Sequence, residues 1–273
     1  MMDQLKKEWL KSEEQQKNFT GWDFSYLDGK WSCEEPPWDY RELVLNYLTP
    51  TMSLLDMGTG GGELLQTFNH PYEQTAVTEG YPPNYQLLLQ TLDPQGVTVK
   101  FVGEEDVLDF PDDSFDLVIN SHESFAVAEV KRVLKPDGLF ISQQVGDFNG
   151  LNLASRLMPE VRKECFDFHL SLVKAELEQH HFDLLFCDEA YLNQQFFDMD
   201  SLIFYVRTIE WEYPGFTVEK NFKELLGLYE ELKDMVRFII CSIVLLLLLV
   251  TQNNVHIKVT TNHFEIPCGE QVI

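Results

Sequence analysis

The chain has few basic residues. It contains 20 Lys and Arg against 45 Asp and Glu in 273 residues, which gives a formal net charge of −25 at pH 7. Proteins that bind RNA or DNA usually neutralise the phosphates with clustered Lys and Arg. The nearest approach to such a cluster is Arg156, Arg162 and Lys163, which is thin. The charge balance therefore argues against a nucleic-acid substrate.

Cysteine is also scarce, and its five residues are widely spread without a C-x-x-C pair. This pattern predicts neither a disulfide framework nor a zinc site, and it fits a reduced cytoplasm. His169 and the pair His180-His181 match no recognised ligand spacing, so no metal site is predicted. The first eight residues lack the apolar segment of a secretory signal. These features indicate a cytoplasmic protein without a bound metal.

A glycine-rich turn organises the chain. Residues 53–65 read as a short apolar strand, a turn with glycine at every second position, and the start of a helix. Such a turn lets a ligand approach the backbone closely, at the carboxyl end of a strand in an open α/β sheet. A dinucleotide site would need G-x-G-x-x-G, whereas the spacing here is D-x-G-x-G-x-G. A nicotinamide-dependent oxidoreductase is therefore disfavoured.

A second predicted strand, residues 74–79, ends in an acid. Glu79 lies 17 residues beyond Gly62, near the spacing at which an acid meets ribose hydroxyls in nucleotide-binding α/β folds. A carboxylate suits this task because it accepts two hydrogen bonds from a cis-diol. The alternative is a solvated acid at the end of a strand.

These segments together resemble the class I S-adenosylmethionine-dependent methyltransferases. The D-x-G-x-G-x-G turn is similar to their motif I. Residues 103–118 are similar to their G-D-A-x-x-L-P-F-P-D-x-S-F-D-x-V run, and residues 134–138 to their L-K-P-G-G turn. The resemblance implies an α/β Rossmann-like fold, with a mostly parallel seven-stranded sheet, an antiparallel edge hairpin and helices on both faces. It also implies S-adenosyl-L-methionine as the cofactor.

The resemblance carries cofactor contacts onto particular residues. It implies that Glu104 accepts the adenine amino group and that the Glu105 backbone faces the adenine ring. The remaining implied cofactor-binding residues lie in the glycine turn and at the ends of the second and fourth strands: Asp56, Gly58, Thr59, Gly60, Gly62, Glu79 and Asn120.

The corner after the fourth strand is the expected place for substrate chemistry, because it lies beside the transferring methyl group in this fold. Methyl transfer is an in-line displacement that chiefly requires alignment. If the acceptor must lose a proton, His122 is a candidate general base, since imidazole titrates near neutrality. Glu123 could orient His122 or act in its place. The alternative is that His122 only forms hydrogen bonds within the loop.

The chain also resembles a narrower group, the bacterial methyltransferase type-11 proteins. The similarity covers roughly residues 1–235 and rests on four short motifs. These are W-D-F-S-Y-L at 22–27, H-E-S-F at 122–125, Q-Q-V-G at 143–146 and I-E-W-E-x-P-G-F at 209–216. The group implies a bacterial source but no particular acceptor.

Four consecutive parts are expected. Residues 1–36 form an N-terminal helix and an aromatic cap, which either closes over the methyl-transfer pocket or covers the sheet edge. Residues 37–146 form the cofactor-binding core. Residues 147–235 add helices and the sixth strand, at about 183–196, to the same domain. Residues 236–273 form an atypical hydrophobic C-terminal segment.

That last segment contains a 13-residue apolar run at 238–250. As a helix the run would span about 20 Å, short of the ~30 Å hydrocarbon core of a bilayer. It could be a core helix or strand, or a membrane or interface anchor. A third alternative is an aberrant C-terminus that replaces the final strand of the family. Residues 260–266 are faintly similar to that strand, so an insertion before it is also open.

The sequence thus favours an S-adenosylmethionine-dependent methyltransferase that acts on a small molecule. One alternative keeps the enzyme but gives it an RNA or protein acceptor. Another is a non-catalytic cofactor-binding or membrane-associated protein with a degenerate C-terminus.

Overall fold

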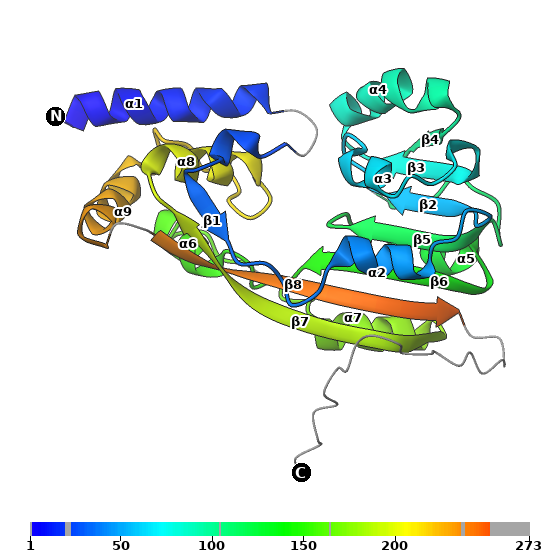
Figure 1. Cartoon of the computed structure of the whole chain (residues 1–273). Coiled ribbons are helices and arrows are strands. Elements are labelled where there is room, and N and C mark those ends of the chain that lie inside the picture. The colour runs from blue at the N-terminus through cyan, green and yellow to red at the C-terminus, as the bar shows by residue number, and fades with distance from the viewer. Residues whose placement is uncertain (1, 20–22, 104, 164, 236–237, 252–273) are drawn as a thin grey trace, which may run out of the picture.

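The computed structural model describes residues 2–19, 23–103, 105–163, 165–235 and 238–251. Within them the chain forms one eight-stranded sheet in the order β1-β7-β8-β6-β5-β2-β3-β4 (Figure 1). The strands are β1 Trp31–Cys33, β2 Leu54–Met57, β3 Thr75–Glu79, β4 Thr98–Phe101, β5 Phe115–Ser121, β6 Leu134–Val145, β7 Phe182–Phe196 and β8 Phe238–Thr251. The helices are α1 Met2–Gln15, α2 Tyr40–Tyr47, α3 Glu63–Thr67, α4 Pro82–Thr91, α5 Val127–Val133, α6 Leu151–Leu157, α7 Leu170–Gln179, α8 Met199–Thr208 and α9 Phe222–Met235.

The five strands from β4 to β6 pair in parallel. Their carboxyl ends therefore meet at one edge of the sheet, where open α/β folds bind ligands. The predicted Rossmann-like fold is confirmed. The predicted strand count of seven was wrong, because the short β1 pairs antiparallel with β7 and extends the sheet.

Both faces of this parallel region are buried. Side chains alternate between the faces along each strand, so neighbouring residues such as Leu54 and Leu55 enter different hydrophobic clusters. Leu54 packs with residues of α2, α3 and α4, whereas Leu55 packs with residues of α5 and α7. The helices thus cover both faces, as predicted.

The apolar run at 238–250 lies within β8. This strand lies between β6 and β7 and is antiparallel to both. Leu246 and Leu248 face one hydrophobic cluster, and Leu247 and Leu249 face the other. From Ile243 to Val250 the run is wholly apolar because both faces of the strand are buried there. Of the alternatives above, the structure supports a core strand. Its antiparallel pairing with β7 is the one expected for the final strand of the family. Residues 260–266, which were also considered for that strand, lie outside the described residues.

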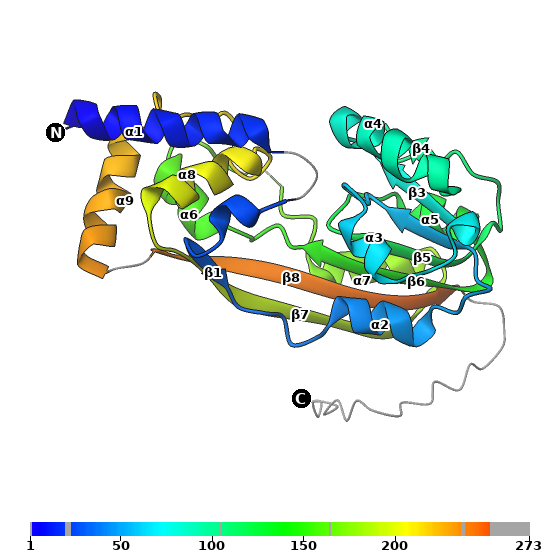
Figure 2. The ribbon, with the colours of Figure 1, turned by 45° about the horizontal axis from the view of Figure 1, so that its top comes forward.

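A second lobe lies at the far end of the long β7–β8 hairpin. The hairpin runs beneath the parallel strands and continues to α1, α6, α8 and α9 (Figures 1 and 2). These helices surround their own hydrophobic core, in which Trp9, Phe204, Tyr213 and Leu225 are almost fully buried. The hairpin therefore joins two separate cores.

The aromatic residues after α1 pack mainly against this second lobe. The rings of Tyr26 and Phe204 stack with centroids 4.5 Å apart, and the Trp31 ring lies 6.0 Å from that of Tyr205. Phe19 differs, because it also lines the cavity described below. The segment accordingly covers α8 and contributes one ring to the cavity. Among the described residues, no helix is both long and apolar enough to cross a membrane.

Candidate functional site

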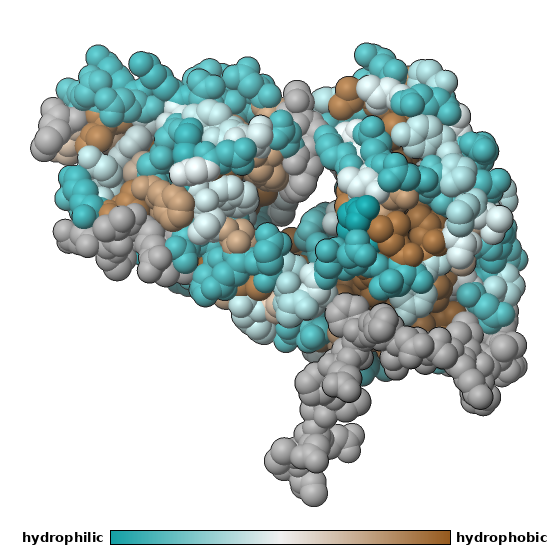
Figure 3. All heavy atoms as spheres, in the orientation of Figure 1, coloured by the Kyte–Doolittle hydropathy of each residue, from teal (hydrophilic) through white to brown (hydrophobic). Residues whose placement is uncertain are grey.

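A cavity of about 530 Å³ lies between the two lobes, which face each other across an open cleft in the space-filling view (Figure 3). Its volume is in the range of small-molecule sites. The wall from the parallel region is formed by Asp56, Gly58, Thr59, Gly60, Glu63, Leu64, Glu79, Tyr81, Asn84, Ser121, His122 and Glu123. The wall from the second lobe is formed by Gln16, Phe19, Arg207, Thr208, Glu210 and Trp211.

Most of the residues predicted for the site are brought together here. Those that line the cavity are Asp56, Gly58, Thr59, Gly60, Glu79, His122 and Glu123. Gly62, Glu105 and Asn120 do not line it, and Glu104 lies outside the described residues. Gly62 instead lets α3 approach Leu92, because a Cβ atom at position 62 would lie 2.8 Å from Leu92 Cδ1.

The glycine turn follows β2 directly. Gly58, Gly60 and Gly62 have φ angles of 65°, 63° and 83°, a region that side chains disfavour. The amide groups of Gly58 and Thr59 both donate to the carbonyl oxygen of Thr78, at 3.0 and 3.2 Å. These bonds tie the turn to β3 and leave its backbone open to the cavity.

Asp56 lies buried near the end of β2. Its Oδ2 atom accepts a hydrogen bond of 2.6 Å from Thr59 Oγ1, which braces the glycine turn. Burial raises the pKa of Asp56 to about 7, and the nearby Glu79 carboxylate adds to the rise. The protein therefore binds a proton on Asp56 more tightly when folded than when unfolded.

We expect Asp56→Asn to stabilise the fold at alkaline pH. Since the pKa is raised by folding, the free energy of unfolding falls as pH increases from about 4 to about 7. The amide cannot ionise, so the variant avoids this loss and should be more stable at pH 8 by on the order of 4 kcal/mol. Urea unfolding at pH 8 and pH 4 measures the difference, which should disappear at the lower pH. The exposed Asp167→Asn serves as control, and a less stable Asp56→Asn protein at pH 8 would contradict the prediction.

Glu79 is buried at the end of β3. Its Oε1 atom accepts a hydrogen bond of 2.8 Å from the Tyr81 amide. Burial raises the pKa of Glu79, and hydrogen bonds from the backbone of Tyr81, Gly60 and Gly80 and the side chain of Asn84 oppose the rise. The carboxylate is thus held against the glycine turn and faces the cavity.

The corner after β5 is fixed by Asn120. Its Oδ1 atom accepts from the Glu123 amide and its Nδ2 atom donates to the Glu123 carbonyl, both at 3.1 Å. Gln144 donates to the same Oδ1 atom at 2.8 Å. The His122 amide donates to the Gln143 carbonyl at 2.8 Å. Asn120 therefore shapes the corner that carries His122 and Glu123 rather than lining the cavity.

The two candidate bases differ in their electrostatics. His122 is exposed, and partial desolvation by the surrounding protein lowers its pKa below the ordinary value of a histidine. Burial raises the pKa of Glu123 to about 7, helped by the carboxylates of Glu79 and Asp106. At neutral pH His122 is uncharged, and Glu123 is the stronger base of the two.

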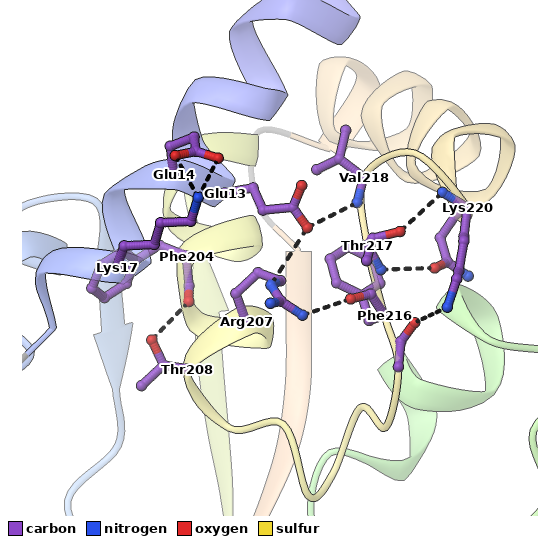
Figure 4. Close-up of polar contacts among 12 residues, drawn as sticks. Glu13, Glu14, Lys17, Phe204, Arg207, Thr208, Phe216, Thr217, Val218 and Lys220 are labelled. Atoms are coloured by element: carbon purple, nitrogen blue, oxygen red, sulfur yellow. Dashed lines mark hydrogen bonds and ion pairs between the residues drawn. The ribbon is translucent and has the colours of Figure 1, made fainter.

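Of the second-lobe wall, only the N-terminal segment with Gln16 and Phe19 was predicted as a possible cover of the pocket, whereas Arg207, Thr208, Glu210 and Trp211 were not predicted. Arg207 on α8 donates to the Phe216 carbonyl at 2.7 Å, and its Nε atom lies 3.4 Å from Glu13 Oε1 on α1. The same Glu13 oxygen accepts from the Val218 amide at 3.2 Å (Figure 4). These contacts tie α1, α8 and the following loop together. Glu210 and Trp211 belong to the I-E-W-E-x-P-G-F motif. The motif identified this loop as a shared feature of the similar proteins, but it did not predict that the loop lines the cavity.

Among the residues that the structure describes, no three His, Cys, Asp or Glu side chains are grouped so that they could hold a metal ion. The four described cysteines, Cys33, Cys165, Cys187 and Cys241, are free.

Residues 55–142 match a family model described as a methyltransferase domain. A curated relative, the mitochondrial arginine-hydroxylase NDUFAF5 of Rattus norvegicus, is 27% identical over 194 residues, which are 66% of this chain and 49% of that protein. The chain therefore spans about half the length of this relative.

Two solved structures share the fold. The YcgJ protein from Bacillus subtilis superposes with a TM-score of 0.54 and 22% identity over 78% of this chain and 98% of its own. A candidate methyltransferase (BH2331) from Bacillus halodurans C-125 gives a TM-score of 0.53 and 18% identity over 79% of this chain and 99% of its own. The family match supports a methyltransferase, and the structures support the same α/β Rossmann-like fold.

Proposed function

We propose that this methyltransferase domain transfers a methyl group from S-adenosyl-L-methionine to a small-molecule acceptor. One observation carries the proposal. The glycine turn after β2, the acid at the end of β3 and the corner after β5 all line a single cavity. The three segments are separate in the sequence, and the parallel sheet brings their ends together.

The residues present suit the cofactor. Gly58 and Gly60 expose backbone where side chains would block an approaching ligand. Glu79 offers a carboxylate to the ribose hydroxyls, and the buried acids suit a ligand with a positively charged sulfonium and ammonium group. When bound, the cofactor supplies an electrophilic methyl group. The contacts of Glu104 and Glu105 with the adenine rest on the family resemblance alone, since Glu105 does not line the cavity.

The corner after β5 would orient the acceptor and receive its proton. We assign proton acceptance to Glu123, because its pKa of about 7 lets it take and release a proton near neutrality. Neutral His122 would hold the acceptor by a hydrogen bond. The walls from both lobes would exclude water and fix the acceptor in line with the methyl group.

Charge and cavity size support a small acceptor. The net charge of −25 repels nucleic acid, and the cavity of about 530 Å³ has the volume of a small-molecule site. The alternative of a non-catalytic protein with a degenerate, membrane-anchoring C-terminus is not supported, because residues 238–250 form part of a strand in the middle of the sheet. The proposal includes a cytoplasmic location and a bacterial source, supported by the free cysteines and by the sequence motifs.

Calorimetric titration with S-adenosylmethionine and, separately, with NADH tests the proposal. We expect only the first to bind, with a dissociation constant on the order of 10 μM. Glu79→Gln should weaken binding by about 10- to 100-fold, because it removes a charged hydrogen-bond acceptor. Glu73→Gln, an exposed residue outside the cavity, is the matched control. Binding of NADH alone would overturn the proposed function.

A further inference from the structure

The cavity is strongly acidic. Five carboxyl side chains line it, namely Asp56, Glu63, Glu79, Glu123 and Glu210. Of the described lining residues, Arg207 is the single Lys or Arg. Such a lining favours a positively charged ligand if the charge of Arg207 is neutralised by a residue outside the cavity.

The Arg207 charge is indeed used within the second lobe. Its guanidinium lies 3.4 Å from the Glu13 carboxylate and donates to the Phe216 carbonyl (Figure 4). Glu13 in turn accepts from the Val218 amide. Arg207 therefore holds α1 to the loop after α8, and its charge is balanced by Glu13 rather than by the cavity acids.

The cavity acids differ in their partners. Glu63 accepts a hydrogen bond of 3.0 Å from the Gly61 amide, and Asp56 and Glu79 are bonded as described above. Glu210 is exposed and lines the cavity from the second lobe. It is thus the lining carboxylate available to a ligand on the second-lobe wall.

Exposed aromatic rings accompany Glu210. The adjacent Trp211 is 66% exposed and Tyr81, on the opposite wall, is 54% exposed, although both line the cavity. Phe19 adds a third, half-buried ring. Ring faces attract organic cations, and Trp does so most strongly. A carboxylate beside aromatic rings is the chemistry that recognises an ammonium group.

We propose that the methyl acceptor is a small organic amine whose ammonium group is held by the Glu210 carboxylate and the rings of Trp211 and Phe19. Before transfer this group would give one proton to Glu123, and the neutral nitrogen would then form a bond to the methyl carbon while the methyl–sulfur bond breaks and its electrons stay on sulfur. This inference rests on the proposed function, since it names the acceptor class of the same cavity. The carboxylates of Glu79 and Glu123 repel each other and add to the negative potential of the cavity.

Three probes that share one ring test the charge preference: benzylamine, benzyl alcohol and benzoate. Each is titrated by NMR at pH 7.5 into protein saturated with S-adenosylhomocysteine. We expect the benzylammonium ion to bind about tenfold more tightly than benzyl alcohol, and benzoate to bind most weakly. Trp211→Ala should weaken the binding of benzylammonium by several-fold.

The charge variant is Glu210→Gln, which should reduce benzylammonium affinity to that of benzyl alcohol. Glu219→Gln is the matched control, because Glu219 is paired with Lys6 outside the cavity; it should retain the preference. Saturable S-adenosylhomocysteine binding without any preference for benzylammonium would overturn this inference and leave the proposed function standing. A preference for benzoate would also overturn it and would assign the acceptor contact to Arg207. Absence of S-adenosylhomocysteine binding would overturn both.

Discussion

Replacing Gly58 with alanine is expected to abolish binding of S-adenosylmethionine while leaving the chain folded. Gly58 has a φ angle of 65°, and a Cβ atom there would lie 2.2 Å from the Cβ atom of Glu123 and 2.5 Å from its Cγ atom. Because the Glu123 Cβ atom is fixed to the backbone, the corner after β5 would have to move. The backbone strain and this overpacking together predict a loss of about 100-fold in affinity.

Gly29→Ala is the control for this variant. Gly29 has a similar φ angle of 74°, but no atom lies within 4 Å of the position of its Cβ atom. Both variants incur the backbone cost of about 1 to 2 kcal/mol, and only Gly58→Ala adds the clash at the cavity. Calorimetry measures the affinities and urea unfolding the stabilities. Equal cofactor affinity in the two proteins would contradict the assignment of the glycine turn.

The second large effect is expected in β8, where Leu247→Ala should lower the free energy of unfolding by about 2 to 5 kcal/mol. Leu247 is fully buried and lies in one cluster with Phe140 and Val173. Truncating it would leave a cavity in the middle of the sheet. Leu247→Asp should prevent folding altogether, since an uncompensated charge would be buried there.

Leu172→Ala provides the matched control for Leu247→Ala. Leu172 lies on α7 and is 46% exposed, so its truncation should change stability by less than about 0.5 kcal/mol. Urea unfolding of the two variants and the parent chain gives the comparison. If Leu247→Ala cost no more than Leu172→Ala, residues 238–251 would not form a central strand.

Much of the parallel region could be predicted from the sequence, because its signals are local. A short apolar strand followed by alternating glycines predicted β2 and its turn, and an acid after an apolar segment placed Glu79 at the end of β3. Prolines suit the first turn of a helix, and those at 82 and 83 occupy the first turn of α4. The resemblance gave the same elements independently.

The place of β8 could not be predicted with the same certainty. A continuous apolar run has no period that separates a strand from a helix. Its identity depends on two partners, β6 and β7, that precede it by many residues. The short β1 also depends on a partner that is distant in the sequence. Its three residues form a strand because they pair with the edge of β7.

The part of the second-lobe wall that α8 and the following loop form was missed because its residues are far from the glycine turn in sequence. Arg207, Glu210 and Trp211 approach the corner after β5 only through the length and course of the β7–β8 hairpin. No local sequence pattern shows how far the hairpin carries these residues toward the corner after β5. The I-E-W-E-x-P-G-F motif showed that the loop is distinctive, but only the structure placed two of its residues in the cavity.

The position of β8 has a consequence for the nascent chain. Val250 pairs with Leu139, and Thr251 pairs with Phe182, so β6 and β7 have no common neighbour until the last described strand has left the ribosome. During synthesis at about 5–20 residues per second, their unpaired edges and apolar faces are exposed for several seconds. Contacts of such long range also form slowly. The joining of β6 and β7 through β8 therefore waits until β8 has been synthesised, and chaperones that shield strand edges would act in that interval.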